Sequence, residues 1–272
     1  MRKIIVLFIL SLFTITLYSQ RSIKIASFNI QNFGKTKMKQ VKIVDTLSTI
    51  VKMFDVIVIQ EISDVNNQTA KAFLKIINKN SKYHYKLACS NRTGLQLNDK
   101  SSQEQYAFYY NSDVLELIDT SLFDDSVYDY FQREPYIASF KTKDDNFSFV
   151  ICTIHTTPEL AVEEIKSLFE VAKWIPNRFK DSKNIIFCGD FNASCNYAKP
   201  EQLANLSIHL PPFNWIIPDT VKTNLSINNN CAYDRFVVTD SLFPHISKWS
   251  VLKFFRSNKV SDHWPVYIEL KF

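Results

Sequence analysis

The sequence predicts a single layered α/β domain with mixed or antiparallel sheets. Short apolar runs bounded by polar residues alternate with stretches in which apolar side chains recur every three or four positions, so both strands and helices are expected. Several apolar runs follow one another with no helical stretch between them, which argues against a simple doubly wound parallel sheet. Of the 272 residues, 46% are hydrophobic and 22% are charged, and this balance excludes a chain that is disordered as a whole.

The apolar runs predict eight strands, over residues 23–30, 56–61, 106–110, 136–140, 147–155, 184–190, 235–239 and 264–270. Helical spacing predicts three helices, over residues 38–51, 65–76 and 161–175, the last of which lies between Pro158 and Pro176. The chain has only three glycines, which excludes the glycine-rich loop of dinucleotide-binding proteins. No repeat or linker interrupts residues 21–272, so we expect one domain.

The first 20 residues predict a secretory signal peptide. Arg2 and Lys3 precede an almost wholly apolar run from Ile4 to Tyr18, and the small Ser19 follows it. The run is shorter than the ~20 residues that cross a bilayer comfortably, so an uncleaved membrane anchor is the weaker alternative. We therefore expect a mature chain, residues 21–272, that is secreted or periplasmic, monomeric and without stable membrane association. Loss of the two cations lowers the formal net charge from +5 to +3, which does not by itself indicate a nucleic-acid partner.

All five cysteines lie in the mature chain, where an oxidising compartment would allow disulfides. Cys152 and Cys188 lie in apolar runs and are interpreted as small hydrophobic residues of buried strands. Cys195 and Cys231 lie in polar, loop-like sequence and are the best candidate pair. Closing a loop of this length stabilises a fold by about 3–4 kcal/mol in the chain-entropy description.

Polar residues of a particular chemistry recur where the predicted strands stop. A single carboxylate at a strand end is usually a helix cap or a surface charge, but eight such residues are hard to attribute to chance: Asn29, Glu61, His155, Asp190, Asn192, Asp234, Asp262 and His263. Their oxygen atoms suit Mg²⁺, Ca²⁺ or Mn²⁺ better than zinc, and the two imidazoles can exchange protons near neutral pH. No nucleophile motif of the G-x-S-x-G type is present, so the pattern indicates hydrolysis by an activated water with a metal ion that offsets phosphate charge.

The segments that carry these residues resemble a known family. In chain order, IKIASFNIQNFG, DVIVIQEI, GDFN and SDHWP resemble the motifs of the endonuclease/exonuclease/phosphatase superfamily. Further segments, among them QEQYAFYY, QREP, IHTTP, WIIPD and NCAYDR, are similar to the deoxyribonuclease I family within it. The resemblance covers nearly all of residues 22–270.

The resemblance implies a four-layer sandwich, in which two central mixed or antiparallel β-sheets pack together and helices cover both outer faces. It also implies site roles. Glu104 would orient His155, Asp234 would orient His263, and Asp190 and Asn192 would lie beside the scissile phosphate. The remaining implied roles are a divalent-ion site of Asn29, Glu61 and Asp262, a phosphate contact from Arg133, and a structural disulfide between Cys195 and Cys231.

The function that the resemblance implies is a secreted, divalent-metal-dependent endonuclease that hydrolyses DNA, expected to be double-stranded, to 5′-phosphate ends with Mg²⁺, or with Ca²⁺ or Mn²⁺. Two departures bear on DNA binding, because Ser63 and Ser102 stand where the family places an arginine and a tyrosine in the minor groove. A third is Lys222, which lies near a ligand position of the family's structural calcium loop and disfavours that site. The alternative is a phosphodiesterase or phosphatase for a lipid or small phosphoester, similar to a sphingomyelinase, for which Phe254 and Phe255 are the one candidate for a membrane-inserting loop.

Overall fold

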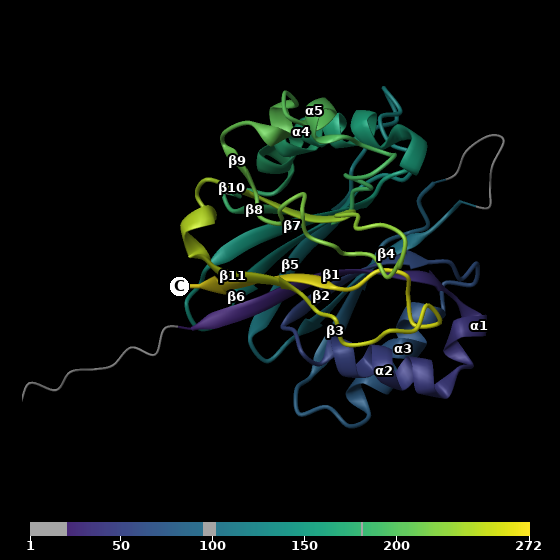
Figure 1. Ribbon diagram of the computed structural model, residues 1–272. Coiled ribbons are helices and arrows are strands. Elements are labelled where there is room, and N and C mark those ends of the chain that lie inside the picture. The colour runs from purple at the N-terminus through teal and green to yellow at the C-terminus, as the bar shows by residue number, and fades with distance from the viewer. Residues whose placement is uncertain (1–20, 95–101, 181) are drawn as a thin grey trace, which may run out of the picture.

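The computed structural model describes residues 21–94, 102–180 and 182–272, so the predicted signal peptide lies outside the described residues. Two six-stranded sheets form the centre, with strand orders β11-β12-β1-β2-β4-β3 and β5-β6-β7-β8-β10-β9. Figure 1 shows helices α2 and α3 below the first sheet and α4 and α5 above the second. The layered α/β sandwich predicted from the sequence is confirmed. Among the described residues, no helix is both long enough and apolar enough to cross a membrane.

The elements of the first sheet and its helices come from both ends of the chain. They are β1 (Ser22–Phe33), α1 (Lys35–Met38), α2 (Val41–Val51), β2 (Val56–Ile62), α3 (Thr69–Asn78), β3 (Tyr85–Cys89), β4 (Gln105–Asn111), β11 (Ile246–Val251) and β12 (Val266–Lys271). The middle of the chain forms the second sheet and its cover: β5 (Leu115–Leu122), β6 (Tyr136–Thr142), β7 (Ser148–His155), α4 (Ala161–Arg178), β8 (Ile185–Asp190), α5 (Pro200–Leu203), β9 (Phe213–Trp215) and β10 (Asp234–Thr239). The described residues also form short 3₁₀ helices at Pro158–Leu160, Ser207–His209 and Phe243–His245.

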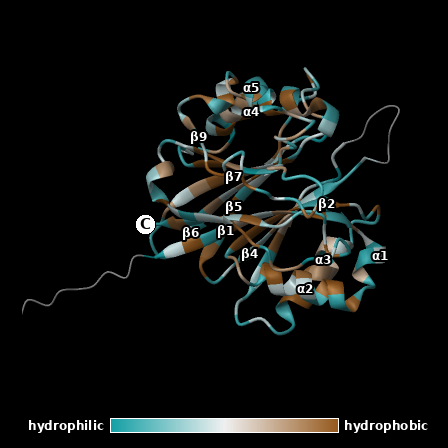
Figure 2. Cartoon of the chain, in the orientation of Figure 1, coloured by the Kyte–Doolittle hydropathy of each residue, from teal (hydrophilic) through white to brown (hydrophobic). Residues whose placement is uncertain are grey.

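Three apolar layers hold these elements together. The layer between the sheets joins side chains of both, such as Phe108 of β4 and Phe140 of β6, whose ring centroids lie 5.9 Å apart. A second layer seals α4 against the second sheet, and a third seals α2 and α3 against the first. Figure 2 shows hydrophobic residues concentrated on the strands and on the inner sides of the helices. Burial on both faces explains why the central strands have near-continuous apolar sequences.

All eight predicted strands are present, with ends that differ by at most a few residues. Four strands were not predicted: β3, β5, β9 and β11. Each is an edge strand that pairs with a neighbour on one side only. Exposed positions interrupt the apolar pattern of β3, β5 and β11, and β9 is only three residues long.

The helix predictions need three corrections. The stripe at residues 38–51 is divided between α1 and α2, with Lys39 and Gln40 between them. Val65 is 73% exposed and precedes α3, so it does not belong to that helix's buried face. Helix α4 continues through Pro176 to Arg178 instead of stopping before the proline. Pro176 cannot donate a backbone hydrogen bond to the preceding turn, but only two residues of the helix follow it, so little of the helix lies beyond the interruption.

The topology brings the predicted polar residues to one edge of the sandwich. Strands β1 and β2 run parallel in the first sheet, as do β7 and β8 in the second, so their carboxyl ends lie side by side. Strands β4, β10 and β12 are antiparallel neighbours of β2, β8 and β1, and each begins at this same edge. The register pairs Asp190 with both His155 and Asp234. One carboxylate is thereby fixed between the strands that carry the other groups.

Candidate active site

Each of the two predicted histidines has its Nδ1 atom on a carboxylate. His155, at the end of β7, has Nδ1 at 3.0 and 3.2 Å from the two oxygens of Glu104, which precedes β4. His263, before β12, has Nδ1 at 2.9 Å from Asp234 Oδ2 at the start of β10. A carboxylate on Nδ1 fixes that nitrogen as the proton donor and leaves Nε2 free to exchange a proton. The two predicted histidine–carboxylate pairs are therefore both formed.

The Nε2 atoms of the two rings converge on Asp190. His263 Nε2 lies 3.5 Å and His155 Nε2 3.8 Å from the same atom, Asp190 Oδ2. All three side chains are buried or nearly so. Because both imidazoles point to one place, a group the size of a phosphate can contact both at once.

The carboxylates set the charge of the two rings. Burial is the largest single influence on the pKa of His155 and lowers it, and Arg133 lowers it further, but the Glu104 and Asp190 carboxylates together raise this pKa above its ordinary value. For His263, burial also lowers the pKa, but Asp234 and Asp190 together raise it well above the ordinary value. The environments therefore favour protonation of His263 more strongly than protonation of His155.

A second cluster of oxygen atoms lies on the first-sheet side of the site. The Asn29 Nδ2 amide donates to Glu61 Oε1 at 2.7 Å and to Asp190 Oδ2 at 3.0 Å, so it links carboxylates of both sheets. Glu61 Oε2 accepts from the backbone N–H of Asn32 at 2.8 Å. Asp262 is tied to this region through its neighbour Ser261, whose hydroxyl donates to the Asn29 carbonyl at 2.7 Å.

The donor set fits a hard divalent cation. Glu61 and Asp190 converge on one amide, and Asp262 Oδ1 is buried without a hydrogen-bond partner among the described residues. A buried carboxylate oxygen without a partner is costly and is typical of an atom that accepts a cation. Asp190, Asp234 and His263 also place ligand atoms within 4.8 Å of one another. We give that group less weight, because Asp234 and His263 are already bonded to each other and a hard cation prefers oxygen.

Asn192 and Arg133 are placed less directly. Asn192 follows β8 and its Nδ2 amide donates to the Thr156 carbonyl at 2.9 Å, while its backbone N–H donates to Asp190 Oδ1 at 3.0 Å. Arg133 is almost buried, and its Nε donates to the His155 carbonyl at 3.1 Å and lies 3.8 Å from Glu104 Oε1. Its contacts in this structure therefore position the His155–Glu104 pair; its phosphate contact stays a prediction.

Lys37 is a site residue that the sequence reasoning did not identify. Its Nζ ammonium donates to the carbonyl oxygens of Ile30 at 2.7 Å, Gln31, and Val260 at 3.1 Å. It thus joins the end of β1 to the segment that carries Asp262. The one signal in the sequence was its place in the GKTKM segment after the first motif.

The backbone is held in unusual conformations where it delivers these groups. Glu61 and Asn192 both have left-handed backbone, with φ of 62° and 47°. Gly189 has φ +150°, and a Cβ atom at this position would lie 1.9 Å from the Ile154 carbonyl oxygen. Only glycine allows β8 to approach β7 so closely, and that approach brings Asp190 to His155.

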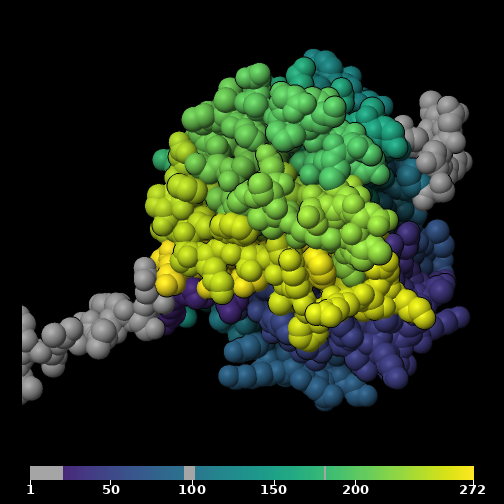
Figure 3. All heavy atoms as spheres, in the orientation of Figure 1, coloured from purple at the N-terminus to yellow at the C-terminus, as the bar shows by residue number. Residues whose placement is uncertain are grey.

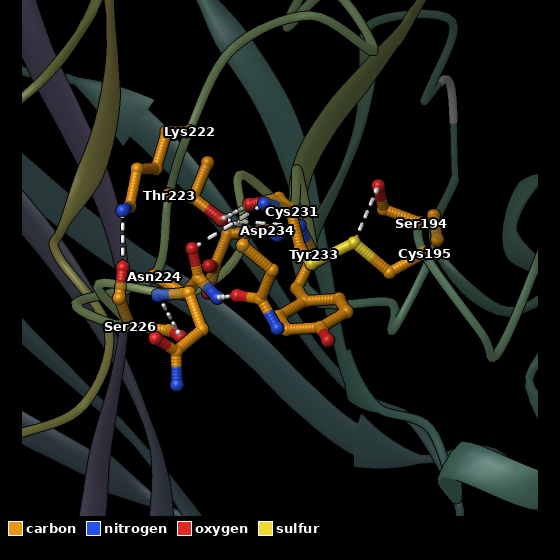
Figure 4. Close-up of a disulfide and its surroundings, with 12 residues drawn as sticks. Ser194, Cys195, Lys222, Thr223, Asn224, Ser226, Cys231, Tyr233 and Asp234 are labelled. Carbon is orange, nitrogen blue, oxygen red and sulfur yellow. Dashed lines mark hydrogen bonds between the residues drawn. A yellow bond between two sulfur atoms is a disulfide. The ribbon is translucent and has the colours of Figure 1, made fainter.

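A disulfide closes the loop that precedes Asp234. Cys195 and Cys231 are bonded, as predicted, with their Cα atoms 5.7 Å apart (Figure 4). Within the loop, the Thr223 hydroxyl accepts from the backbone N–H groups of Tyr233 at 3.1 Å and Asp234 at 3.2 Å. Lys222 donates to the Ser226 carbonyl, so its ammonium is used inside the loop. The bridge therefore anchors the segment that positions the carboxylate on His263.

Comparisons with known proteins agree on one family. The profile described as Endonuclease/Exonuclease/phosphatase family matches residues 26–263. The chain is 33% identical to deoxyribonuclease gamma of Homo sapiens over 282 residues, which cover 96% of this chain and 90% of the relative. It is 32% identical to deoxyribonuclease-1 of Gallus gallus, covering 92% of this chain and 93% of that protein. Among solved structures, an endonuclease/exonuclease/phosphatase family protein from Bacteroides thetaiotaomicron superposes with a TM-score of 0.66 at 19% identity, covering 94% and 96% of the two chains.

Proposed function

The chain belongs to the endonuclease/exonuclease/phosphatase family, and on that premise we propose that it is a secreted, divalent-metal-dependent deoxyribonuclease that cuts DNA endonucleolytically and leaves 5′-phosphate ends. The observation that carries the proposal is the convergence of two carboxylate-held imidazoles on Asp190. The relatives named deoxyribonuclease, which match nearly the whole chain, support DNA as the substrate. Double-stranded DNA as substrate and a monomeric enzyme are parts of the same proposal.

The two imidazoles take different parts in the proposed reaction. His155, whose pKa is raised less because Arg133 opposes Glu104, removes a proton from the attacking water. As the new P–O bond forms, the bond to the leaving 3′-oxygen breaks. His263, whose pKa is raised well above the ordinary value by Asp234 and Asp190, donates its proton to that oxygen. Asn192, beside Asp190, contributes an amide near the phosphate.

The metal is proposed on the chemistry of the donor set. Asn29, Glu61 and Asp262 are the residues proposed to hold a Mg²⁺ ion, with Ca²⁺ or Mn²⁺ as alternatives. Asn29 is bonded to Glu61, and Asp262 has a buried oxygen without a hydrogen-bond partner among the described residues. When bound, such an ion offsets the negative charge that builds up on the phosphate.

The lipid-directed alternative has less support. Phe255 is 8% exposed and packs on Phe28 with ring centroids 6.0 Å apart, so only Phe254 of the pair faces solvent. One exposed phenylalanine is a weak membrane contact. Secretion rests on the predicted signal at residues 1–20, and sequencing the N-terminus of the exported protein tests it directly.

A plasmid-nicking assay tests the proposal. The chain is expected to convert supercoiled DNA to open circles with Mg²⁺, to stop on addition of a chelator, and to leave ends that ligate without prior phosphorylation. His155→Ala is expected to abolish nicking while the fold is retained. Undiminished nicking by folded His155→Ala, or nicking that chelation does not stop, refutes the proposal. A parallel assay with a lipid phosphodiester separates the alternative.

A further inference from the structure

A groove of about 730 Å³ opens beside His263. Two loops line it, residues 224–228 and residues 256–259, together with Tyr233, Asp262 and His263. In Figure 3 the yellow-green residues of the first loop's region lie directly above the yellow C-terminal segments on the same face. Because His263 belongs both to the candidate site and to the groove wall, the groove is continuous with the site.

The chemistry of the lining favours a polar, anionic ligand. Amides of Asn228 and Asn258 and hydroxyls of Ser226 and Ser257 supply neutral hydrogen-bonding groups, whereas the amide of Asn224 is bonded within its own loop. The charged side chains beyond His263 are Arg256, Lys259 and Asp262, and Asp262 is assigned to the proposed metal site. The two cations therefore set the charge of the part of the groove that lies away from the metal.

Arg256 and Lys259 are both exposed, and neither side chain has an ion pair or hydrogen bond with another part of the chain that the structure describes. Nearby lysines differ in this respect. Lys248 pairs with Glu269 at 3.7 Å, and Lys253 lies over the Trp264 ring at 5.1 Å. Two unpaired cations along a groove that leads to a catalytic histidine create a positive potential, which attracts an anionic ligand into the groove.

We propose that this groove holds the DNA strand on one side of the scissile phosphate, with Arg256 and Lys259 each contacting a backbone phosphate. The inference rests on the proposed function. A strand whose phosphate contacts both Nε2 atoms has to continue past one of the two rings, and past His263 it enters the groove. Contacts to phosphates set the position of a strand and its affinity without reading its sequence.

Salt dependence of DNA binding measures these contacts. In a His155→Ala background with chelator present, a short fluorescent DNA duplex binds without being cleaved. Each phosphate contact contributes about 0.9 to the slope of log affinity against log salt, so Arg256→Ala with Lys259→Ala should reduce the slope by about 2. If the variant and its parent bind DNA equally well at about 1 M salt, this difference in slope makes the variant's binding about 30-fold weaker at about 0.15 M salt.

Two variants control for net charge and for geometry. Lys75→Ala with Lys79→Ala removes the same charge from exposed positions on and just after α3 and should leave affinity and slope at the parent values. The exchange Arg256→Lys with Lys259→Arg keeps both cations and should retain most of the slope. If the groove variant matches the α3 variant, the groove inference is overturned while nicking by the parent enzyme still supports the proposed function. If the parent enzyme nicks no DNA, the proposed function itself has failed.

Discussion

Removing His263 should slow the cleavage of DNA far more than the cleavage of a substrate whose leaving group needs no proton. In the proposed reaction His263 protonates the leaving 3′-oxygen, and loss of a general acid costs about 10²- to 10⁴-fold in rate. In the p-nitrophenyl ester of thymidine 5′-phosphate, the leaving phenolate departs without a proton. We expect His263→Ala to lose about 10²- to 10⁴-fold in kcat/KM on DNA and about tenfold or less on the ester. His155→Ala, which lacks the base, should lose similar factors on both substrates.

The same change should also destabilise the fold. His263 Nδ1 lies 2.9 Å from Asp234 Oδ2, and Asp234 is 0% exposed with its other oxygen unpartnered among the described residues. Removing the imidazole leaves a buried carboxylate without its partner, which costs about 3–5 kcal/mol. That is a large part of the ~5–15 kcal/mol that keeps a typical domain folded.

A second variant separates folding from chemistry. His263→Ala combined with Asp234→Asn removes the imidazole and also the negative charge that it would leave unpaired, so the thermal unfolding temperature should recover part of the way toward that of the parent protein while DNA cleavage stays low. The assay is therefore run on both variants, with calorimetry and both substrates. Equal losses on DNA and on the ester in the folded double variant would show that His263 is not the general acid, and the division of roles between the imidazoles would fall.

Three further predictions concern the frame around the site. Calorimetry of Cys195→Ser with Cys231→Ser should show a loss of about 4 kcal/mol for the closed loop, seen as a melting temperature about 8–16 °C lower; Cys89→Ser, a free cysteine, is the control, and an equal change in both would contradict the loop argument. The carboxylates beside the two imidazoles raise the pKa values of His155 and His263 despite burial. With chelator present, the contribution of these pairs to the free energy of unfolding should therefore be complete at pH values below the ordinary pKa of imidazole and should be lost as the pH rises through the raised pKa values. A melting temperature that rises over that pH range would contradict this. Gly189→Ala should give little folded protein on expression, because its Cβ would overlap the Ile154 carbonyl, and normal yield and activity would show that the strands can separate there.

The central strands and the polar residues at their ends were predictable from the sequence because each depends on local pattern. Strands buried on both faces have continuous apolar sequences, and the change to Asn, Asp, Glu or His at their ends is visible by position alone. The edge strands β5 and β11 were missed because solvent on one side admits polar residues at any position. The division of the first predicted helix into α1 and α2 lies at Lys39 and Gln40, which no strong helix-breaking residue marks.

The pairing of the site residues was not accessible from local pattern. Glu104 and His155 are 51 positions apart, and nothing in either segment indicates that their side chains meet. That pairing came from the resemblance to a family. The role of Lys37 in joining the end of β1 to the segment of Asp262 was missed for a related reason. Its three hydrogen-bond acceptors are backbone carbonyls, one of them 223 positions away, and every residue has a backbone carbonyl, so the sequence does not mark them. The family resemblance assigned Arg133 to a phosphate of the substrate. In the structure its side chain contacts the His155 carbonyl and Glu104, because the side chain is almost buried, and the sequence does not show how deeply a side chain is buried.

The hydrogen bonds that assemble the site also join the two sheets, and this couples catalysis to the fold. Asn29 belongs to the first sheet and Asp190 to the second, yet one amide links them at 3.0 Å. Asp190 in turn is the common neighbour of an imidazole from β7 and an imidazole that precedes β12. A shift of one sheet against the other would therefore separate the two rings before it exposed the apolar layer between the sheets. It follows that substitutions in that layer, such as Phe108→Ala, should lower activity by misplacing the rings even where the protein stays folded.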